Sequence, residues 1–323
     1  MKYIAAIDAV EELETLEQTD GVMLTGEDCL IRMEDQRLLM QSLLLNPPQV
    51  ETDKRLAQML HSQHILWLEK IEECARSQLC IRLPDRPADD MLPQTQAEFA
   101  RLADYTGQSA AELQEQVASL RSVNPDLSSR GCRMMIDNEL LFRTLLRAMF
   151  IAADQRGVHE LSILLPFVSD AREVQFLKAI IAQHAATYQI TCAIGIEIAT
   201  PRAACIAEEL AVCADAIVFN VEELVQLLYG MSQRDSKKVL CRYLHEKVFR
   251  HNPFHEFDEI GIGTLLTIAL EQIRRVKPNI RLSAIGHPVL CEKGRKFCND
   301  MGIDMLIGQQ HLFRMAGVLE SAT

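Results

Sequence analysis

Aromatic residues are scarce in this chain, at 5% of 323 residues with a single tryptophan. A hydrophobic core must therefore be built mainly from Leu, Ile, Val, Met and Ala side chains. Paired cysteine spacing is also absent, because none of the ten cysteines forms a C-x-x-C motif. This argues against a disulfide framework and favours reduced thiols that are buried as small apolar groups in the cytosol.

Basic residues are also fewer than acidic residues. The 33 Lys and Arg residues face 45 Asp and Glu residues, which gives a formal net charge of −12. This excess disfavours nonspecific binding to nucleic acid, which depends on basic side chains that neutralise phosphates. The sequence also has no apolar run that could span a bilayer, no signal-like start and no P-loop. We expect a cytoplasmic protein that binds neither nucleic acid nor membrane, in which any anionic ligand needs a local basic pocket.

Short apolar runs recur along the whole chain at lengths typical of buried strands. They are continuous rather than alternating, as expected for parallel strands that are covered on both faces. Eight such runs occur, at residues 3–7, 21–25, 79–83, 162–167, 193–198, 216–221, 281–286 and 305–308. Segments of helical period lie between them, for example 170–188, 201–214, 263–276 and 291–302. This alternation predicts an α/β fold, a (β/α)8 TIM barrel.

Two connections are longer than simple crossovers. Residues 26–78 are acidic and helix-prone, and residues 84–160 contain the turn-rich sequence LPDRPADDMLP followed by helical spacing. We see no internal repeat, low-complexity tract or Gly/Ser linker. The expectation is a single barrel domain over 1–323, with elaborated loops after strands 2 and 3.

The most informative stretch is 192–235, in which the turns after two strands carry polar residues. In parallel α/β proteins such turns face the ligand crevice. The stretch resembles the barrel domain of the phosphoenolpyruvate-utilising enzymes, and most closely that of the pyruvate phosphate dikinases. That family has a Met-Ile-Glu-x-Pro strand end and a Gly-Thr-Asn-Asp-Leu-x-Gln strand end. Pro201 and Gln226 match these motifs, whereas the Glu position is Ala199 and the Asn-Asp pair is Glu222-Glu223.

Four further segments carry the same resemblance in the same order along the chain: CIRLPDRPADDMLP (80–93), LRSVNPDLSSRGCR (120–133), LPFVSDAREV (165–174) and HNPFHEFDEIGIGTLL (251–266). They imply a C-terminal phosphoenolpyruvate/pyruvate-binding barrel, but they say less about activity, which must be argued from the site. The phosphohistidine and ATP-grasp domains that the family uses do not fit into this chain beside a barrel. Phosphoryl transfer would therefore need a phosphoryl-carrier protein in trans.

The resemblance also implies a set of arginines that bind the phosphate and carboxylate of the substrate. Arg82 matches the arginine after strand three, and Arg130, followed by Arg133, matches the Arg-Gly-x-Arg loop. Arg234 matches another if one residue is inserted before it, and the fourth arginine falls on Gly26. A partly retained pocket for a small phosphoenolpyruvate- or pyruvate-like anion is therefore expected.

The metal site of the family, in which one Glu and one Asp hold Mg²⁺, is more strongly altered. Glu223 keeps a carboxylate at the Asp position, Glu222 adds a negative charge where the family has Asn, and Ala199 supplies no ligand. Glu197, two residues before Ala199, faces the same side of its strand. It could bind a displaced cation or pair with an arginine inside the barrel, and we favour the pair because an unpaired buried charge is costly. Mg²⁺ is implied by the resemblance and weakened by these substitutions.

The proton donor of the family, a Cys at the end of strand seven, is replaced by Ile285, which has no exchangeable proton. His287 stands at the family's acidic position on the same face. Its intrinsic pKa suits acid–base catalysis, although a structural hydrogen bond is the alternative role.

Three interpretations stay open. The first is a barrel that binds a small phosphorylated or carboxylated ligand, or a partner, without the family's reaction. The second is an enzyme with shifted residues, namely Glu197 and Glu223 for metal, His287 for proton transfer and the arginines for an anion. The third is a structural role, for example as a homodimer. We favour the first, because the losses at Ala199, Ile285 and Gly26 affect groups that act as a unit.

Overall fold

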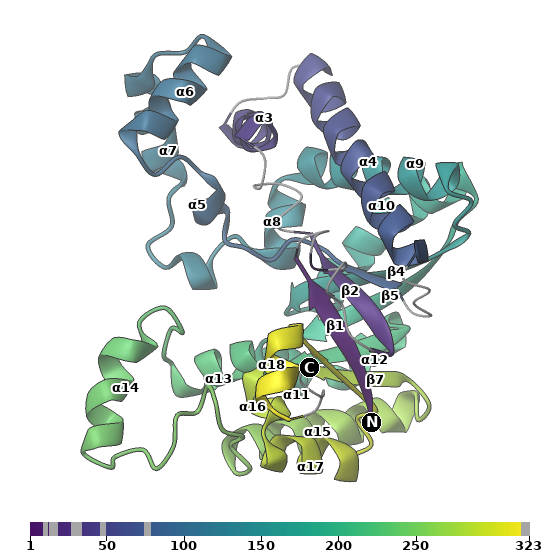
Figure 1. Ribbon diagram of the computed structural model, residues 1–323, viewed down its shortest axis with the longest axis vertical. Helices are drawn as coiled ribbons and strands as arrows, with labels where there is room; N and C mark the ends of the chain where they lie inside the picture. The colour runs from purple at the N-terminus through teal and green to yellow at the C-terminus, as the bar shows by residue number, and fades with distance from the viewer. Residues whose placement is uncertain (9–11, 13–18, 27–33, 46–49, 74–78, 318–323) are drawn as a thin grey trace.

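The described residues form a closed barrel of parallel strands in the order β1 to β8 (Figure 1). The structure is a computed structural model that describes residues 1–8, 12, 19–26, 34–45, 50–73 and 79–317. The strands are β1 (Lys2–Ile7), β2 (Gly21–Thr25), β3 (Leu79–Arg82), β4 (Glu160–Val168), β5 (Thr191–Ile198), β6 (Ala216–Asn220), β7 (Arg281–Ile285) and β8 (Met305–Gly308). The predicted (β/α)8 TIM barrel is confirmed, and each predicted apolar run overlaps one of these strands.

The register between neighbouring strands is regular except where β4 pairs with β5. β1 pairs with both β2 and β8, which closes the barrel, and all neighbours run parallel. The pairing of β4 with β5 shifts register between Leu165 and Val168. Such a bulge re-aims the end of a strand, and this one lies beside the arginine cluster described below.

The barrel interior has an apolar lower part and a polar upper part. The apolar part is a cluster of buried inward-facing side chains: Ile4, Ala6, Met23, Leu164, Val218 and Ile307. The larger core lies between the strands and the surrounding helices. Because side chains alternate along each strand, residues two positions further on also face inward. Arg82, Glu197 and Asn220 are placed by this alternation at the C-terminal end of the barrel.

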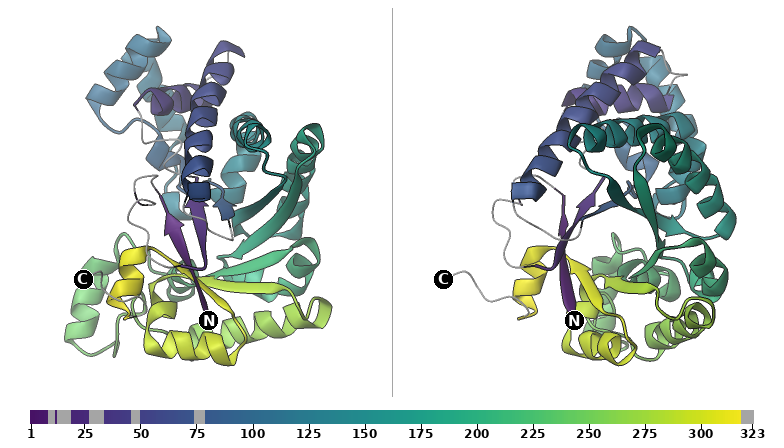
Figure 2. Two further views of the ribbon diagram at one scale, coloured as in Figure 1. Left: turned by 45° about the vertical axis from the view of Figure 1, so that its right-hand side comes forward. Right: turned by 90° about the vertical axis from the view of Figure 1, so that its right-hand side faces the viewer.

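The long connections after β2 and β3 stand together on one side of the barrel (Figures 1 and 2). The first contains α3 (Glu34–Leu45) and α4 (Val50–Glu73). Parts of the predicted 26–78 connection, at 27–33, 46–49 and 74–78, lie outside the described residues. The second contains α5 (Ala88–Met91), α6 (Gln96–Thr106), α7 (Ala110–Leu120), the 3₁₀ helix η1 (Pro125–Leu127), α8 (Gly131–Asp137) and α9 (Glu139–Gln155). Capping boxes at Thr95 and Ser109 begin α6 and α7, as expected for Ser/Thr followed by Glu three residues later.

The remaining helices complete the outer ring. They are α10 (Ala171–Tyr188), α11 (Pro201–Cys205), α12 (Ala207–Cys213), α13 (Val221–Tyr229), α14 (Ser236–His245), α15 (Gly261–Val276), α16 (His287–Leu290), α17 (Glu292–Asp300) and α18 (Gln310–Met315). The segment predicted as one helix over 201–214 is divided at Ile206 into α11 and α12. α14 extends away from the barrel (Figure 1). Among the described helices, none is both long and apolar enough to cross a membrane.

Candidate functional site

Arg82 and Glu197 form a buried ion pair inside the upper end of the barrel. Arg82 is the last residue of β3, and Glu197 lies on β5 with its side chain completely removed from solvent. The guanidinium donates from Nε to Oε2 of Glu197 at 2.7 Å and from Nη2 to Oε1 at 3.1 Å. This two-bond arrangement is the strong form of an Arg–carboxylate pair. Of the two roles left open for Glu197, the arginine pair is the contact that the structure shows.

Asn220 connects this pair to the start of α13. Its amide nitrogen donates to Oε1 of Glu197 at 2.9 Å, and its amide oxygen accepts from the backbone N–H of Glu223 at 3.2 Å. The second contact makes Asn220 the N-cap of α13. Asn is a preferred N-cap, and carboxylates are favourable in the first turn of a helix. One residue therefore orients the Glu197 carboxylate and holds Glu223 in position.

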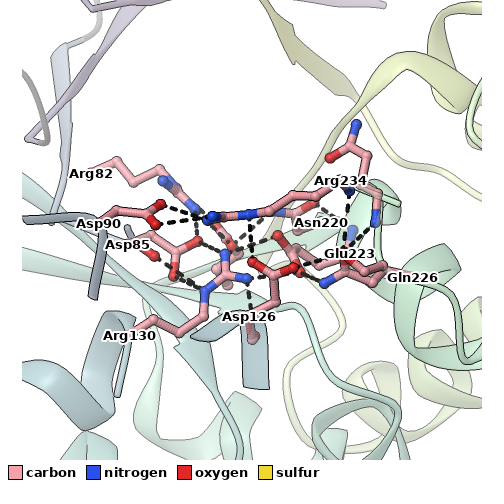
Figure 3. Close-up of polar contacts among 12 residues, drawn as sticks. Arg82, Asp85, Asp90, Asp126, Arg130, Asn220, Glu223, Gln226 and Arg234 are labelled. Carbon is pink, nitrogen blue, oxygen red and sulfur yellow. Dashed lines mark hydrogen bonds and ion pairs between the residues drawn. The ribbon is translucent and has the colours of Figure 1, made fainter. Parts of the chain in front are cut away.

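Arg130 lies between two carboxylates on opposite sides of the site (Figure 3). From Nη2 it donates to Asp85 at 2.7 Å and to Glu223 at 2.8 Å. Nε makes a further contact with Asp85, and Nη1 makes one with Glu223. Asp85 also accepts from Nη2 of Arg82 at 2.7 Å. We call Arg82, Asp85, Arg130, Glu197, Asn220 and Glu223 the mouth cluster.

The ring of Phe167 supports Arg130 from below. The guanidinium carbon of Arg130 lies 4.4 Å from the ring centroid, a cation–π distance. Phe167 is buried and has a backbone φ of 55°. A positive φ is unusual for a bulky residue, so the bulge at the end of β4 holds this ring under the guanidinium at a conformational cost.

A pocket of about 260 Å³ opens outward from the mouth cluster. At its rim, Arg234 donates from both terminal nitrogens to Asp90, at 2.9 and 2.5 Å, and its Nε lies 2.8 Å from Asp126 (Figure 3). About half of the Arg234 side chain is exposed. We call this the outer pocket; its lining residues are Asp85, Arg86, Pro87, Asp90, Asp126, Arg130, Glu223, Gln226, Gln233 and Arg234.

Burial and neighbouring charges shift the proton affinities in the mouth cluster. Burial raises the pKa of Glu223 to about 7; Arg130 opposes this shift, and the carboxylates of Asp85 and Glu197 add to it. Burial alone would lower the pKa of Arg130, but Asp85 and Glu223 outweigh it and keep the pKa above its ordinary value. Arg130 therefore stays charged at neutral pH, whereas Glu223 takes up a proton as the pH falls below 7.

This proton uptake predicts a pH-dependent stability that Glu223→Gln removes. The folded-state pKa of Glu223 exceeds its unfolded value, so the folded protein binds the proton more tightly and loses stability as the pH rises toward 8. Urea unfolding between pH 5 and 8 should show wild type losing on the order of 2 kcal/mol more than the variant. Equal pH profiles for the two proteins would contradict the buried position of this carboxylate.

Three of the predicted site residues lie outside the mouth cluster: Arg234 lines the outer pocket, whereas Arg133 and His287 do not. Arg133 donates to the backbone oxygen of Leu127 at 2.9 Å, and its guanidinium carbon also lies over the Phe167 ring, 5.2 Å from the centroid. The ring of His287 packs on that of His255 with centroids 4.7 Å apart. The backbone N–H of His287 donates to Glu222 at 2.9 Å. The ligand-binding role of Arg133 and the catalytic role of His287 stay predictions, and neither residue lines the outer pocket.

Gly26, which stands where the family has its fourth arginine, is closely surrounded by other atoms. A Cβ atom built at this position would lie 2.9 Å from Cδ of Pro84 and 3.1 Å from the backbone oxygen of Arg82. The backbone N–H of Gly26 donates to that same oxygen at 2.9 Å. An arginine could not be restored here without moving the turn after β3.

The donor set does not fit Mg²⁺. Both carboxylates that were considered as ligands, Glu197 and Glu223, are bound to guanidinium groups. A cation placed against them would have to displace an arginine or lie beside its positive charge, which is unfavourable. Within the described residues, no group of three or more His, Cys, Asp or Glu side chains is placed to hold a metal.

Sequence reasoning missed three of the carboxylates that pair with the arginines, namely Asp85, Asp90 and Asp126. Asp85 bridges Arg82 and Arg130, although from the sequence only the arginines were assigned a role. The available signal was an acid three residues after Arg82, which can contact it locally. Asp90 and Asp126 reach Arg234 from segments more than 100 residues away in sequence. No local pattern could have assigned those two contacts.

Comparison with known proteins agrees with this geometry. Residues 4–306 match the family model described as PEP-utilising enzyme, PEP-binding domain. Pyruvate, phosphate dikinase of Rhizobium meliloti (strain 1021) is 30% identical over 297 residues, covering 88% of this chain and 33% of that protein. The chloroplastic enzyme of Flaveria bidentis is 33% identical over 236 residues, covering 69% and 25%. The chain thus spans a third or less of the length of these two relatives.

Among solved structures, pyruvate kinase from Pyrobaculum aerophilum aligns over 99% of this chain and 72% of that chain, with 11% identity and a TM-score of 0.41. This value is too low to add to the barrel that the sheet itself displays. The family model, in contrast, spans most of the chain, from β1 to β8. The chain therefore belongs to the family of phosphoenolpyruvate-utilising enzymes, of which it contains the phosphoenolpyruvate-binding domain.

Proposed function

We propose that this chain is a ligand-binding barrel that does not carry out the phosphoryl transfer of its family. The observation that carries the proposal is that both arginines of the mouth cluster, Arg82 and Arg130, are bound by carboxylates of the chain itself. In a phosphoenolpyruvate site these guanidinium groups would have to be available to a phosphate or a carboxylate. Here Glu197 and Glu223 occupy that place.

The substitutions around the cluster support the same proposal. Ala199 offers no metal ligand, and Ile285 offers no proton to an enolate carbon. A catalytic site whose groups act together loses most of its rate when one member is removed. With metal ligand and proton donor both replaced, the barrel can still bind, but it lacks the means for the ancestral chemistry.

The ligand that we propose is small and carries a carboxylate or phosphate group that enters from the outer pocket. It would compete with Glu223 for Arg130, because Glu223 is the more accessible of that arginine's two carboxylate partners. Protonation of Glu223 below pH 7 weakens its hold on Arg130. An incoming anion should therefore bind more tightly at pH 6 than at pH 8.

The alternative of an active enzyme with shifted residues needs Glu197 and Glu223 as metal ligands. Both already accept hydrogen bonds from arginines, so we favour the binding function. Dimerisation, a phosphoryl carrier in trans and a cytoplasmic location stay predictions.

Calorimetric titration with oxalate, a dianion that resembles enolpyruvate, tests the proposal. We expect weak binding whose dissociation constant changes by less than about twofold between Mg²⁺ and EDTA, because no carboxylate pair is available for the cation. Titrations with phosphoenolpyruvate and pyruvate serve as parallel arms. Binding that becomes at least about tenfold tighter with Mg²⁺ would contradict the proposal.

A further inference from the structure

The outer pocket has a mixed charge that the family resemblance does not account for. We propose that it binds a small zwitterion, a molecule with one ammonium group and one carboxylate or phosphate group. This inference rests on the proposed function, since it names the class of ligand that the binding barrel would take.

The charge balance of the walls is the first argument. Four carboxylates line the pocket, at Asp85, Asp90, Asp126 and Glu223, against the guanidinium groups of Arg86, Arg130 and Arg234. With all groups ionised the pocket keeps one negative charge, and the buried pair behind it adds none. A dianion or trianion would increase this negative charge in a partly buried site, which is unfavourable. A zwitterion with a carboxylate leaves the balance unchanged, and one with a phosphate adds less negative charge than the same phosphate without its ammonium group.

The remaining hydrogen-bonding capacity at the rim is the second argument. Each oxygen of Asp90 accepts one hydrogen bond from Arg234, whereas a carboxylate oxygen can accept about two. Asp126 is in the same state, with one oxygen on Arg234 and the other on the hydroxyl of Ser232. These two carboxylates can therefore accept from a ligand ammonium group without giving up their present partners.

Donors for the anionic end lie on the same rim. Arg86 is exposed, and within the described part of the chain it makes no hydrogen bond or ion pair through its side chain. Arg234 uses one N–H of each terminal nitrogen on Asp90, which leaves one on each for a ligand. Donors and acceptors thus line the same opening, as recognition of a molecule with both charges requires.

The volume of the pocket limits the size of the ligand. At about 260 Å³ it falls below the range of roughly 300–1,000 Å³ that is typical of pockets for drug-sized ligands. Ammonium and acid groups separated by two or three atoms are compatible with this space. A nucleotide or a longer peptide is not.

Calorimetry at pH 7.5 with matched probes tests the inference. β-Alanine carries both charges, propionate only the anion and ethylamine only the cation; phosphoethanolamine and ethyl phosphate form the corresponding phosphate pair. We expect one of the two zwitterions to bind at least about tenfold more tightly than its single-charge counterparts. Preference for β-alanine identifies a carboxylate ligand, and preference for phosphoethanolamine identifies a phosphate ligand.

A variant pair assigns the effect to the pocket. Asp90→Asn should reduce the preference of the zwitterion over its anionic counterpart by about fivefold or more, because one acceptor for the ammonium group loses its charge. Asp235→Asn is the control, since Asp235 pairs with Lys238 on an exposed surface outside the pocket. Thermal unfolding of both variants checks that each is folded.

The inference would be overturned if neither β-alanine nor phosphoethanolamine bound at least about tenfold more tightly than its single-charge counterparts. An unchanged preference in Asp90→Asn would also overturn it. The proposed function fails by a different result, namely Mg²⁺-dependent binding of oxalate. The two failures are therefore distinguishable.

Discussion

Replacement of Glu197 by leucine is expected to lower the free energy of unfolding by about 3–5 kcal/mol, the usual cost of removing one partner from a buried ion pair. Arg82 is 8% exposed and would lose its two hydrogen bonds to Glu197 while keeping the one to Asp85. The amide of Asn220 would also lose its acceptor on Glu197. Urea unfolding at pH 7 measures the change.

Two matched variants separate the ion pair from general effects of the substitution. Glu139→Leu removes a half-exposed carboxylate that pairs with Arg143 on a helix surface, and should cost less than about 1 kcal/mol. The double variant Arg82→Met/Glu197→Leu should be more stable than Glu197→Leu alone, since no buried charge is left without its partner. If Glu197→Leu were as stable as wild type, the carboxylate would not be compensating Arg82.

The second large effect is expected at Gly131, next to Arg130. Gly131 has φ +51°, and a Cβ atom there would lie 2.7 Å from Cβ of Phe167 and 2.9 Å from Oδ1 of Asp85. Gly131→Ala should therefore cost about 3 kcal/mol or more, combining roughly 1–2 kcal/mol for the left-handed backbone with overpacking of similar size. Urea unfolding measures it, and anion binding should weaken because Asp85 and Phe167 both hold Arg130.

Gly157→Ala is the control for this prediction. Gly157 has φ +68°, and nothing lies within 4 Å of its added Cβ. Only the backbone cost of about 1–2 kcal/mol should remain. Equal destabilisation by the two substitutions would show that the close approach of Gly131 to β4 does not restrict the site.

The strands could be predicted from sequence because a parallel barrel buries both faces of each strand, which leaves continuous apolar runs. β2 and β8 coincide with their predicted ranges, whereas β4 and β5 each begin two residues earlier in the structure. The first residues of these two strands, Glu160 and Thr191, are exposed and polar, so no apolar signal marks where the strands begin. The division at Ile206 was missed because the apolar pattern continues through it.

Only the part of the site that depends on strand alternation could be predicted from the sequence. Alternation placed Glu197 inside the barrel, and the general cost of a buried charge favoured a pair with an arginine, although it did not name Arg82 as that arginine. It could not identify Asp85 as the bridge to Arg130, because the turn after β3 decides where that side chain points. Long-range partners such as Asp126 and Arg234, which meet across the outer pocket, follow from the closed barrel and not from any local pattern.

The measurement that tests the central claim most directly is the oxalate titration carried out on wild type and Glu223→Gln side by side, with Mg²⁺ and with EDTA. If Glu223 occupies Arg130 in place of a ligand, the variant should bind oxalate several-fold more tightly than wild type at pH 8, and Mg²⁺ should have no effect on either protein. If Mg²⁺ instead tightens binding to wild type and Glu223→Gln abolishes that gain, Glu223 is a metal ligand. The barrel would then have kept the metal-dependent site of its family.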